Sequence, residues 1–246
     1  ITAAARAGKA VFTEKVLSFT AAEAEEIAAV IRETGVPFQI SLRRRTEGRL
    51  VYLKKMLDEG VIGQVTHLRV RDAHDGASSG WLPDSFFDLT QCGGGAMMDL
   101  GAHPMYLCLW LLGEPQTVTS VFSEMTGKGA DDNCISVLHY ENGAVATSET
   151  AFVSKRCPFS VEVNGTGGSI LINDFFPGEI FLNTGDGVQR ITAEEYGSDL
   201  PQPAPLFVEC LRDKKPMPFP VEDAVALSRL MEAAYKSAAT GEAAAY

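Results

Sequence analysis

Asp99 and His103 are the two side chains of this sequence whose types and spacing best suit acid–base chemistry. They stand four residues apart in the apolar run GGGAMMDLGAHPMYLCLWLLG. If the run is one helix, residues at this spacing share a face, with Cβ atoms roughly 5–6 Å apart. A carboxylate beside an imidazole fixes the tautomer of the ring and favours its charged form. The pair is therefore predicted to take a proton from a substrate hydroxyl near neutral pH.

The same residues allow a structural interpretation. Asp99 would then cap the helix after Gly93–Gly95, and His103 would be a satisfied core residue. Pro104 bears on both interpretations, because it has no N–H to donate to the carbonyl of Leu100, so the helix kinks near His103 or begins later. The local sequence supports the two interpretations about equally.

Lys15, His74 and Trp81 are further candidates for a ligand site. Lys15 follows a short apolar strand and precedes a helix, and ligands of open α/β sheets collect at the carboxyl ends of strands. Judged by itself, such a lysine is more often a solvated loop residue. His74 and Trp81 lie in a loop before the three glycines, where they are candidates for lining a pocket. Gly93–Gly95 fit either a close approach to a ligand or a flexible turn.

The first part of the chain has the pattern of a parallel α/β sheet. Residues 1–42 alternate helix, strand, helix, strand, and the clearest helix begins with a capping-box spacing at Thr20 and stops at Gly35. A further helix is predicted at 46–59. It leads into a strand whose alternation places Leu68 and Val70 on one face.

After the apolar run, the pattern changes to short strands separated by Gly, Asn and Asp. Asn142-Gly143 and Asn164-Gly165 lie between alternating apolar runs and predict hairpins with type I′ turns. The segment NGTGG at 164–168 precedes a strand, which favours a turn over a phosphate-binding loop. The second half is therefore predicted to be mostly antiparallel sheet.

Composition excludes several classes of function. The 21 Lys and Arg against 32 Asp and Glu give a net charge of -11, which opposes binding to nucleic acid or to anionic membranes. No apolar run is long enough to span a bilayer, and no secretory signal is recognisable. Five scattered cysteines suggest reduced core residues, and four histidines without paired ligand spacing argue against a metal centre. We expect a cytoplasmic enzyme.

Several segments, taken in order, resemble the Gfo/Idh/MocA (glucose-fructose oxidoreductase / inositol dehydrogenase) family. They are TEKVLSF, GGGAMMDLGAHPMYLCLWLLGEP, DNCISVLHYENGAVATSETAF, VEVNGTGGSILI and VEDAVALSRLMEAAYKSAATG. The resemblance implies an α/β fold in the α+β sense, in which a largely antiparallel open sheet covered by helices follows the remnant of a Rossmann domain. The implied boundary divides residues 1–42 from a substrate-binding and oligomerisation domain at 43–246.

The resemblance also implies an activity and roles for particular residues. Family members move a hydride between a hydroxyl-bearing carbon of a sugar or cyclic polyol and NAD or NADP. By position, Lys15, Asp99 and His103 match the catalytic residues and are expected to contact substrate. His74 and Trp81, which are candidates from their place in the loop alone, are expected to contact it as well. Glu14, Lys15 and Arg44 are expected near the cofactor, although the family arginine could equally be Arg43. A homodimer or homotetramer through the antiparallel sheet is the implied assembly.

Two departures from the family pattern affect these expectations. Val16 replaces the proline of the Glu-Lys-Pro motif, and the glycine-rich dinucleotide motif is absent from these 246 residues. We therefore expect the chain, as given, to lack much of a Rossmann domain and to bind the cofactor weakly and be inactive by itself. The alternatives are a non-catalytic carbohydrate-binding or dimerisation module, and a hydrolase or epimerase assisted by bound NAD.

Overall fold

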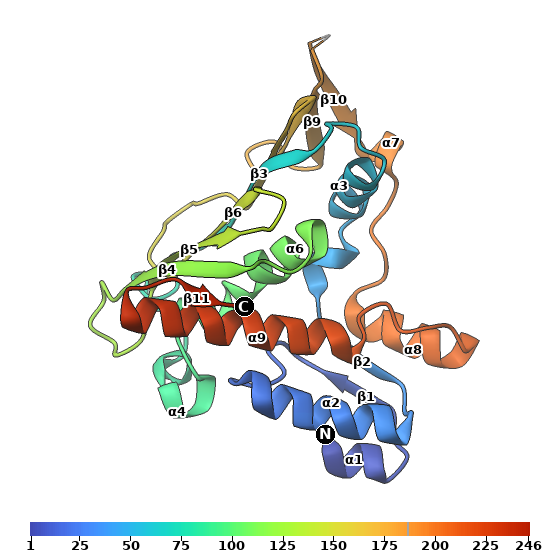
Figure 1. Ribbon diagram of the computed structural model, residues 1–246, viewed down its shortest axis with the longest axis vertical. Helices are drawn as coiled ribbons and strands as arrows, with labels where there is room; N and C mark the ends of the chain where they lie inside the picture. Colours follow the sequence, from blue (N-terminus) through green and yellow to red (C-terminus); the bar gives the residue numbers. More distant parts are fainter. Residues whose placement is uncertain (186) are drawn as a thin grey trace.

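A nine-stranded sheet and a separate two-stranded sheet form the framework of the chain (Figure 1). The computed structural model describes residues 1–185 and 187–246. The strands are β1 (Val11–Thr13), β2 (Phe38–Ile40), β3 (Val65–Ala73), β4 (Thr117–Ser123), β5 (Asn133–His139), β6 (Val145–Ala151), β7 (Ser160–Gly165), β8 (Gly168–Asn173), β9 (Glu179–Asn183), β10 (Val188–Thr192) and β11 (Ala244–Ala245). The helices are α1 (Thr2–Arg6), α2 (Ala21–Thr34), α3 (Gly48–Asp58), α4 (Leu89–Cys92), α5 (Ala96–Asp99), α6 (Ala102–Leu112), α7 (Ala193–Tyr196), α8 (Pro203–Asp213) and α9 (Val221–Thr240), with 3-10 turns η1 (Arg43–Thr46) and η2 (Asp84–Phe87).

The first 42 residues fold as predicted, into a helix, strand, helix, strand unit. Strands β1 and β2 pair in parallel, and α2 connects them. The side chain of Thr20 accepts a hydrogen bond from the N–H of Glu23 at 3.3 Å, which caps the start of α2. The helix ends at Gly35, whose φ of 62° is the left-handed conformation that glycine adopts most easily.

The large sheet is mostly antiparallel, as predicted. Its strand order is β10-β9-β8-β7-β3-β6-β5-β4-β11. Among the described strands of this sheet, β3 and β6 form the one parallel pair, a pairing that the local sequence did not predict. The chain between these two strands contains the helical segment that carries Asp99 and His103, followed by β4 and β5.

Helices cover one face of the large sheet and leave the other open. Leu68 and Val70 of β3 lie on the covered face, with exposed fractions of 1% and 0%, which confirms the predicted alternation. Helix α6 packs on β3 and β6, and α9 packs on β4 and also on α2 and β2. Figure 1 shows α9 running between the large sheet and the N-terminal unit. The buried apolar residues of both parts form one cluster; the proposed domain boundary after residue 42 stays a prediction.

The two predicted hairpins form, but their turns differ from the prediction. Before β6, the N–H of Gly143 donates to Tyr140 at 3.0 Å, and Gly143, but not Asn142, has a positive φ. Type I′ is therefore wrong for this turn, since it needs positive φ at both central residues. In the second hairpin Gly165 pairs with Gly168, so the residues between them form the turn. A Cβ on Gly165 would lie 2.2 Å from the carbonyl oxygen of Ile62, which explains the glycine by packing.

The helices follow the predicted order with small changes of boundary. The helix predicted at 46–59 is divided into η1 and α3. Helix α9 has acidic residues in its first turn and ends at Gly241 with a φ of 73°. Among the described residues, we find no helix with the length and apolar character needed to cross a membrane.

Candidate active site

The apolar run that carries Asp99 and His103 is two helices rather than one. Helix α5 ends at Asp99 and α6 begins at Ala102. Pro104 lies in the first turn of α6, where its missing N–H costs little. The later start that Pro104 allowed is therefore the observed one, although Leu100 and Gly101 between the two helices keep helical dihedral angles.

Lys15 and Asp99 form a close ion pair. The Nζ atom of Lys15 lies 2.7 Å from Oδ1 of Asp99, and the side chain of Lys15 is only 10% exposed. The same ammonium group donates to the backbone carbonyl of Asp99. The interpretations of Lys15 as a solvated loop residue and of Asp99 as a helix cap are therefore both wrong. Glu14, its neighbour, is exposed, and the peptide bond from Lys15 to Val16 is cis.

His103 contacts Tyr106 instead of Asp99. Its Nδ1 atom lies 2.9 Å from the hydroxyl oxygen of Tyr106, three residues further along α6. Burial lowers the pKa of His103 well below its ordinary value, and the positive charges of Lys15 and Arg44 act in the same direction. The predicted pairing with Asp99, and with it a pKa raised by that carboxylate, is wrong: Asp99 pairs with Lys15, and His103 contacts Tyr106.

Arg44 is held inside the site by two carboxylates. Its guanidinium donates to Asp72 at 2.7 Å and 3.1 Å and to Glu47 at 2.8 Å, and it lies over the ring of Phe159, 3.9 Å from the centroid. Burial opposes the charge of Arg44, but Asp72 and Glu47 outweigh it and raise the pKa. Three of its five N–H groups are used in this way, so Arg44 anchors η1 to β3; its predicted contact with the cofactor stays a prediction.

His74 and Trp81 lie together at the rim of the site. The ring of His74 stacks on Phe152 with centroids 5.0 Å apart, and Trp81 lies 4.7 Å from it. The Nδ1 atom of His74 accepts a hydrogen bond from the N–H of Gly76 at 3.1 Å, so the neutral His74 ring carries its proton on Nε2. Burial lowers the pKa of His74, against the field of Asp99 and other carboxylates. The indole of Trp81 is 57% exposed, and the predicted contact of both residues with substrate stays a prediction.

The three glycines before α5 pack against protein. A Cβ on Gly95 would lie 2.0 Å from the carbonyl oxygen of Asp131, and one on Gly94 would lie 2.0 Å from the hydroxyl of Tyr235. The Asp131 carboxylate accepts hydrogen bonds from the backbone N–H groups of Gly95 at 2.9 Å and Met97 at 2.8 Å. The glycines therefore let α5 approach the loop at residue 131, which fixes where Asp99 points.

Three residues that build the site had no role assigned from the sequence. Tyr106 was counted as part of an apolar helix, although its i+3 spacing from His103 places both on one face. Asp72 continues the face of Leu68 and Val70, so a carboxylate on an otherwise apolar face was the available signal. Asp131 had no local signal for this role, because the backbone N–H groups that donate to it lie 34 and 36 residues away.

The fold and the site together define a class: an α/β protein with a mostly antiparallel open sheet, in which a lysine that follows a parallel strand pairs with an aspartate and lowers the pKa of a nearby buried histidine. The model of the GFO/IDH/MocA C-terminal domain matches residues 50–171. Trans-1,2-dihydrobenzene-1,2-diol dehydrogenase of Mus musculus is 30% identical over 245 residues, which are 94% of this chain and 71% of that protein.

Two further comparisons agree. Inositol 2-dehydrogenase of Rhizobium meliloti (strain 1021) is 26% identical over 197 residues, 76% of this chain and 56% of that protein. A solved structure of levoglucosan dehydrogenase in complex with NADH and levoglucosan has the same fold, with a TM-score of 0.88 at 23% identity over 99% of this chain and 75% of the other. The chain belongs to the GFO/IDH/MocA family, which confirms the resemblance found in the sequence.

Proposed function

We propose that this chain supplies the substrate site of an NAD(P)-dependent oxidoreductase that moves a hydride between a hydroxyl-bearing ring carbon of a sugar or cyclic polyol and nicotinamide. The observation that carries the proposal is the ion pair of Lys15 with Asp99, 84 residues away, close enough to His103 for the lysine charge to lower its pKa. Relatives named for inositol and for a cyclic dihydrodiol support this substrate class.

Each of the three side chains has a distinct role in this proposal. An ammonium group has three N–H donors, and Lys15 gives two of them to Asp99. The third has no acceptor among the described residues, and we assign it to the substrate oxygen, where the positive charge stabilises a developing alkoxide. Asp99 holds Lys15 in place, and His103 exchanges the hydroxyl proton.

The chain's residues fit one end of a nicotinamide dinucleotide. Lys15 follows β1 and Arg43 and Arg44 follow β2, and the carboxyl ends of parallel strands are where such sheets bind ligands. Glu14, Lys15 and Arg44 are the residues we assign to the neighbourhood of NAD or NADP. When bound, the nicotinamide supplies or accepts the hydride.

Turnover of a panel of substrates tests the proposed function. We expect the full-length protein, supplied with NAD or NADP, to produce absorbance of reduced nicotinamide with a cyclic polyol or sugar such as inositol or levoglucosan. Primary open-chain alcohols serve as controls and should react far more slowly, because they lack the hydroxyl-bearing ring carbon of the proposed substrates. Hydrolysis or epimerisation without net reduction would instead support the NAD-assisted alternative.

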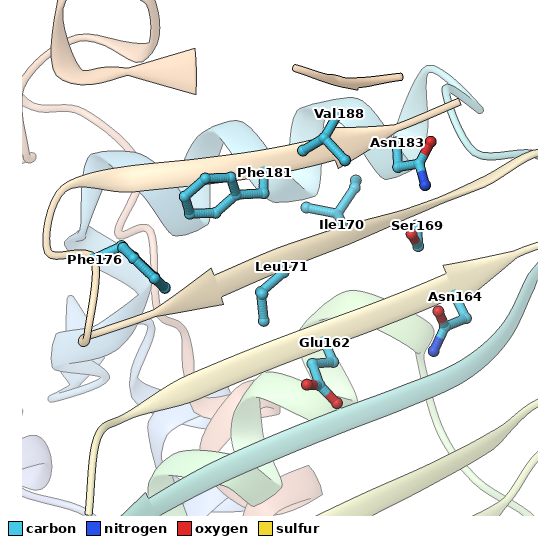
Figure 2. A pocket seen from close by; sticks show the side chains of 9 residues that line it. All are labelled: Glu162, Asn164, Ser169, Ile170, Leu171, Phe176, Phe181, Asn183 and Val188. Carbon is cyan, nitrogen blue, oxygen red and sulfur yellow. The ribbon is translucent and has the colours of Figure 1, made fainter. Parts of the chain in front are cut away.

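The open face of the large sheet is the surface we assign to self-association. Val121 and Val188 on this face are each 66% exposed and Phe176 is 51% exposed. Figure 2 shows Phe176, Phe181 and Val188 among the side chains that line a hollow on strands β7 to β10. The hollow has a volume of about 520 Å³. Exposed apolar side chains gathered in this way are typical of protein interfaces. We propose a homodimer or homotetramer through this sheet.

We also assign a cytoplasmic location to the protein, and the five free cysteines agree with it.

Val121→Asp is expected to dissociate the oligomer. A charge placed on this face would lose its hydration in the interface at a cost of several kcal/mol. Val208→Asp is a matched control, since Val208 is 60% exposed on α8, outside the large sheet. Light scattering after size exclusion should give a dimer or tetramer for the wild type and the control, and a monomer for Val121→Asp. A monomeric wild type would contradict the proposal.

A further inference from the structure

Tyr106 occupies a position between the backbone of η1 and the imidazole of His103. Its hydroxyl oxygen lies 2.9 Å from the N–H of Arg44 and 2.9 Å from Nδ1 of His103. The side chain is 2% exposed. The hydroxyl is therefore a buried group whose hydrogen bonds come from protein, and those partners can be counted.

The count fixes the direction of each hydrogen bond. A backbone N–H can only donate, so the Tyr106 oxygen accepts from Arg44. The hydroxyl hydrogen then needs an acceptor, and among the described residues Nδ1 of His103 is the acceptor within hydrogen-bond distance. Leaving a buried hydroxyl hydrogen without a partner costs about 1–3 kcal/mol. In the neutral state, His103 consequently carries its proton on Nε2.

We propose that Tyr106 is a positioning residue that holds His103 in the Nε2–H tautomer, through a chain of hydrogen bonds from the Arg44 N–H to the Tyr106 hydroxyl and on to Nδ1. The inference rests on the proposed function for its consequence. In this tautomer, Nε2 is a hydrogen-bond donor, which suits the oxygen of a carbonyl compound. To take a proton from an alcohol at Nε2, the ring must first exchange to the Nδ1–H tautomer while the Tyr106 hydroxyl turns away.

Three further observations agree with a hydrogen bond from the Tyr106 hydroxyl to Nδ1 of His103. His103 and Tyr106 meet edge to face, with centroids 5.5 Å apart and planes at 79°, which keeps Nδ1 directed at the hydroxyl. Asp99, the carboxylate first predicted to set the tautomer, is paired with Lys15. Burial raises the pKa of Tyr106 far above its ordinary range, so the group remains a phenol and keeps its proton to donate.

Long-range ¹H–¹⁵N correlation spectra of protein labelled with ¹⁵N-histidine test the proposal, because the pattern of ring couplings distinguishes the two tautomers. The signal of His103 is assigned by its loss in His103→Gln. We expect the Nε2–H pattern in the wild type and a shift to the Nδ1–H tautomer or a mixture in Tyr106→Phe. Tyr140→Phe is the matched control, since the Tyr140 hydroxyl is also buried but lies 3.5 Å from the Cys108 carbonyl; it should keep the wild-type pattern.

Two outcomes would overturn the proposal: an Nδ1–H tautomer in the wild type, or an unchanged His103 pattern in folded Tyr106→Phe. If Tyr106→Phe does not fold, a coupling between the Tyr106 hydroxyl proton and Nδ1 across the hydrogen bond decides the question in the wild type, and its absence counts against the proposal. The spectra need no turnover. A protein with the expected tautomer but without dehydrogenase activity would contradict the proposed function only.

Discussion

His103→Ala is expected to lower kcat by about 100- to 10,000-fold, the range for loss of a positioned acid–base group. KM should change little, because the imidazole acts on the proton that is transferred in the transition state and contributes little to binding of the substrate ring. Steady-state rates of nicotinamide reduction by the full-length protein measure both constants. His139→Ala is the control, since His139 is exposed on β5, and it should keep the wild-type kcat.

The pH dependence of the same reaction adds a second test of His103. Its pKa lies well below the ordinary value of histidine, about 6.5. The ring is therefore neutral throughout the neutral range, and alcohol oxidation should lose rate only at pH values well below 6.5, where the ring becomes protonated. A rate that falls through pH 6.5 or above, or an undiminished kcat in His103→Ala, would contradict the role assigned to His103.

Lys15→Met is expected to lower kcat/KM by about 100- to 1,000-fold, the typical cost of removing one donor that stabilises a developing negative oxygen. Methionine keeps most of the length and apolar volume of the lysine stem, so the main change is the loss of the charge and its donors. The stability of the fold should change little, because the Asp99 side chain is 36% exposed and water can replace the lost partner. Thermal unfolding and initial rates measure the two effects separately.

Two companion variants make the result on Lys15 specific. Lys9→Met removes a charge from an exposed residue just before β1 and should leave kcat/KM unchanged. Asp99→Asn combined with Lys15→Met should cost little more than Lys15→Met alone, because Asp99 acts by holding the ammonium group. Fully additive losses would show that Asp99 acts independently of Lys15, and an active Lys15→Met would remove the lysine from the proposed site.

Much of the fold follows from local chemistry. The helix from Thr20 to Gly35 is defined by a side-chain cap and a left-handed glycine, features that neighbouring residues determine. The alternation of Leu68 and Val70 identifies the covered face of β3 because side chains of a strand point alternately to its two faces. The hairpin turns were less predictable, since packing against Ile62 decided the place of Gly165.

The sequence by itself determined the family and the order of the elements, and its motifs supplied the residues proposed for the site, Lys15, Asp99 and His103. Only the tertiary structure decided their partners. Spacing along one helix suggested an Asp99 to His103 pair, but Asp99 pairs with Lys15, which lies 84 residues away in the sequence. His103 is left to Tyr106. The physical reason is that hydrogen-bond partners depend on contacts between distant segments, which a local periodicity does not encode.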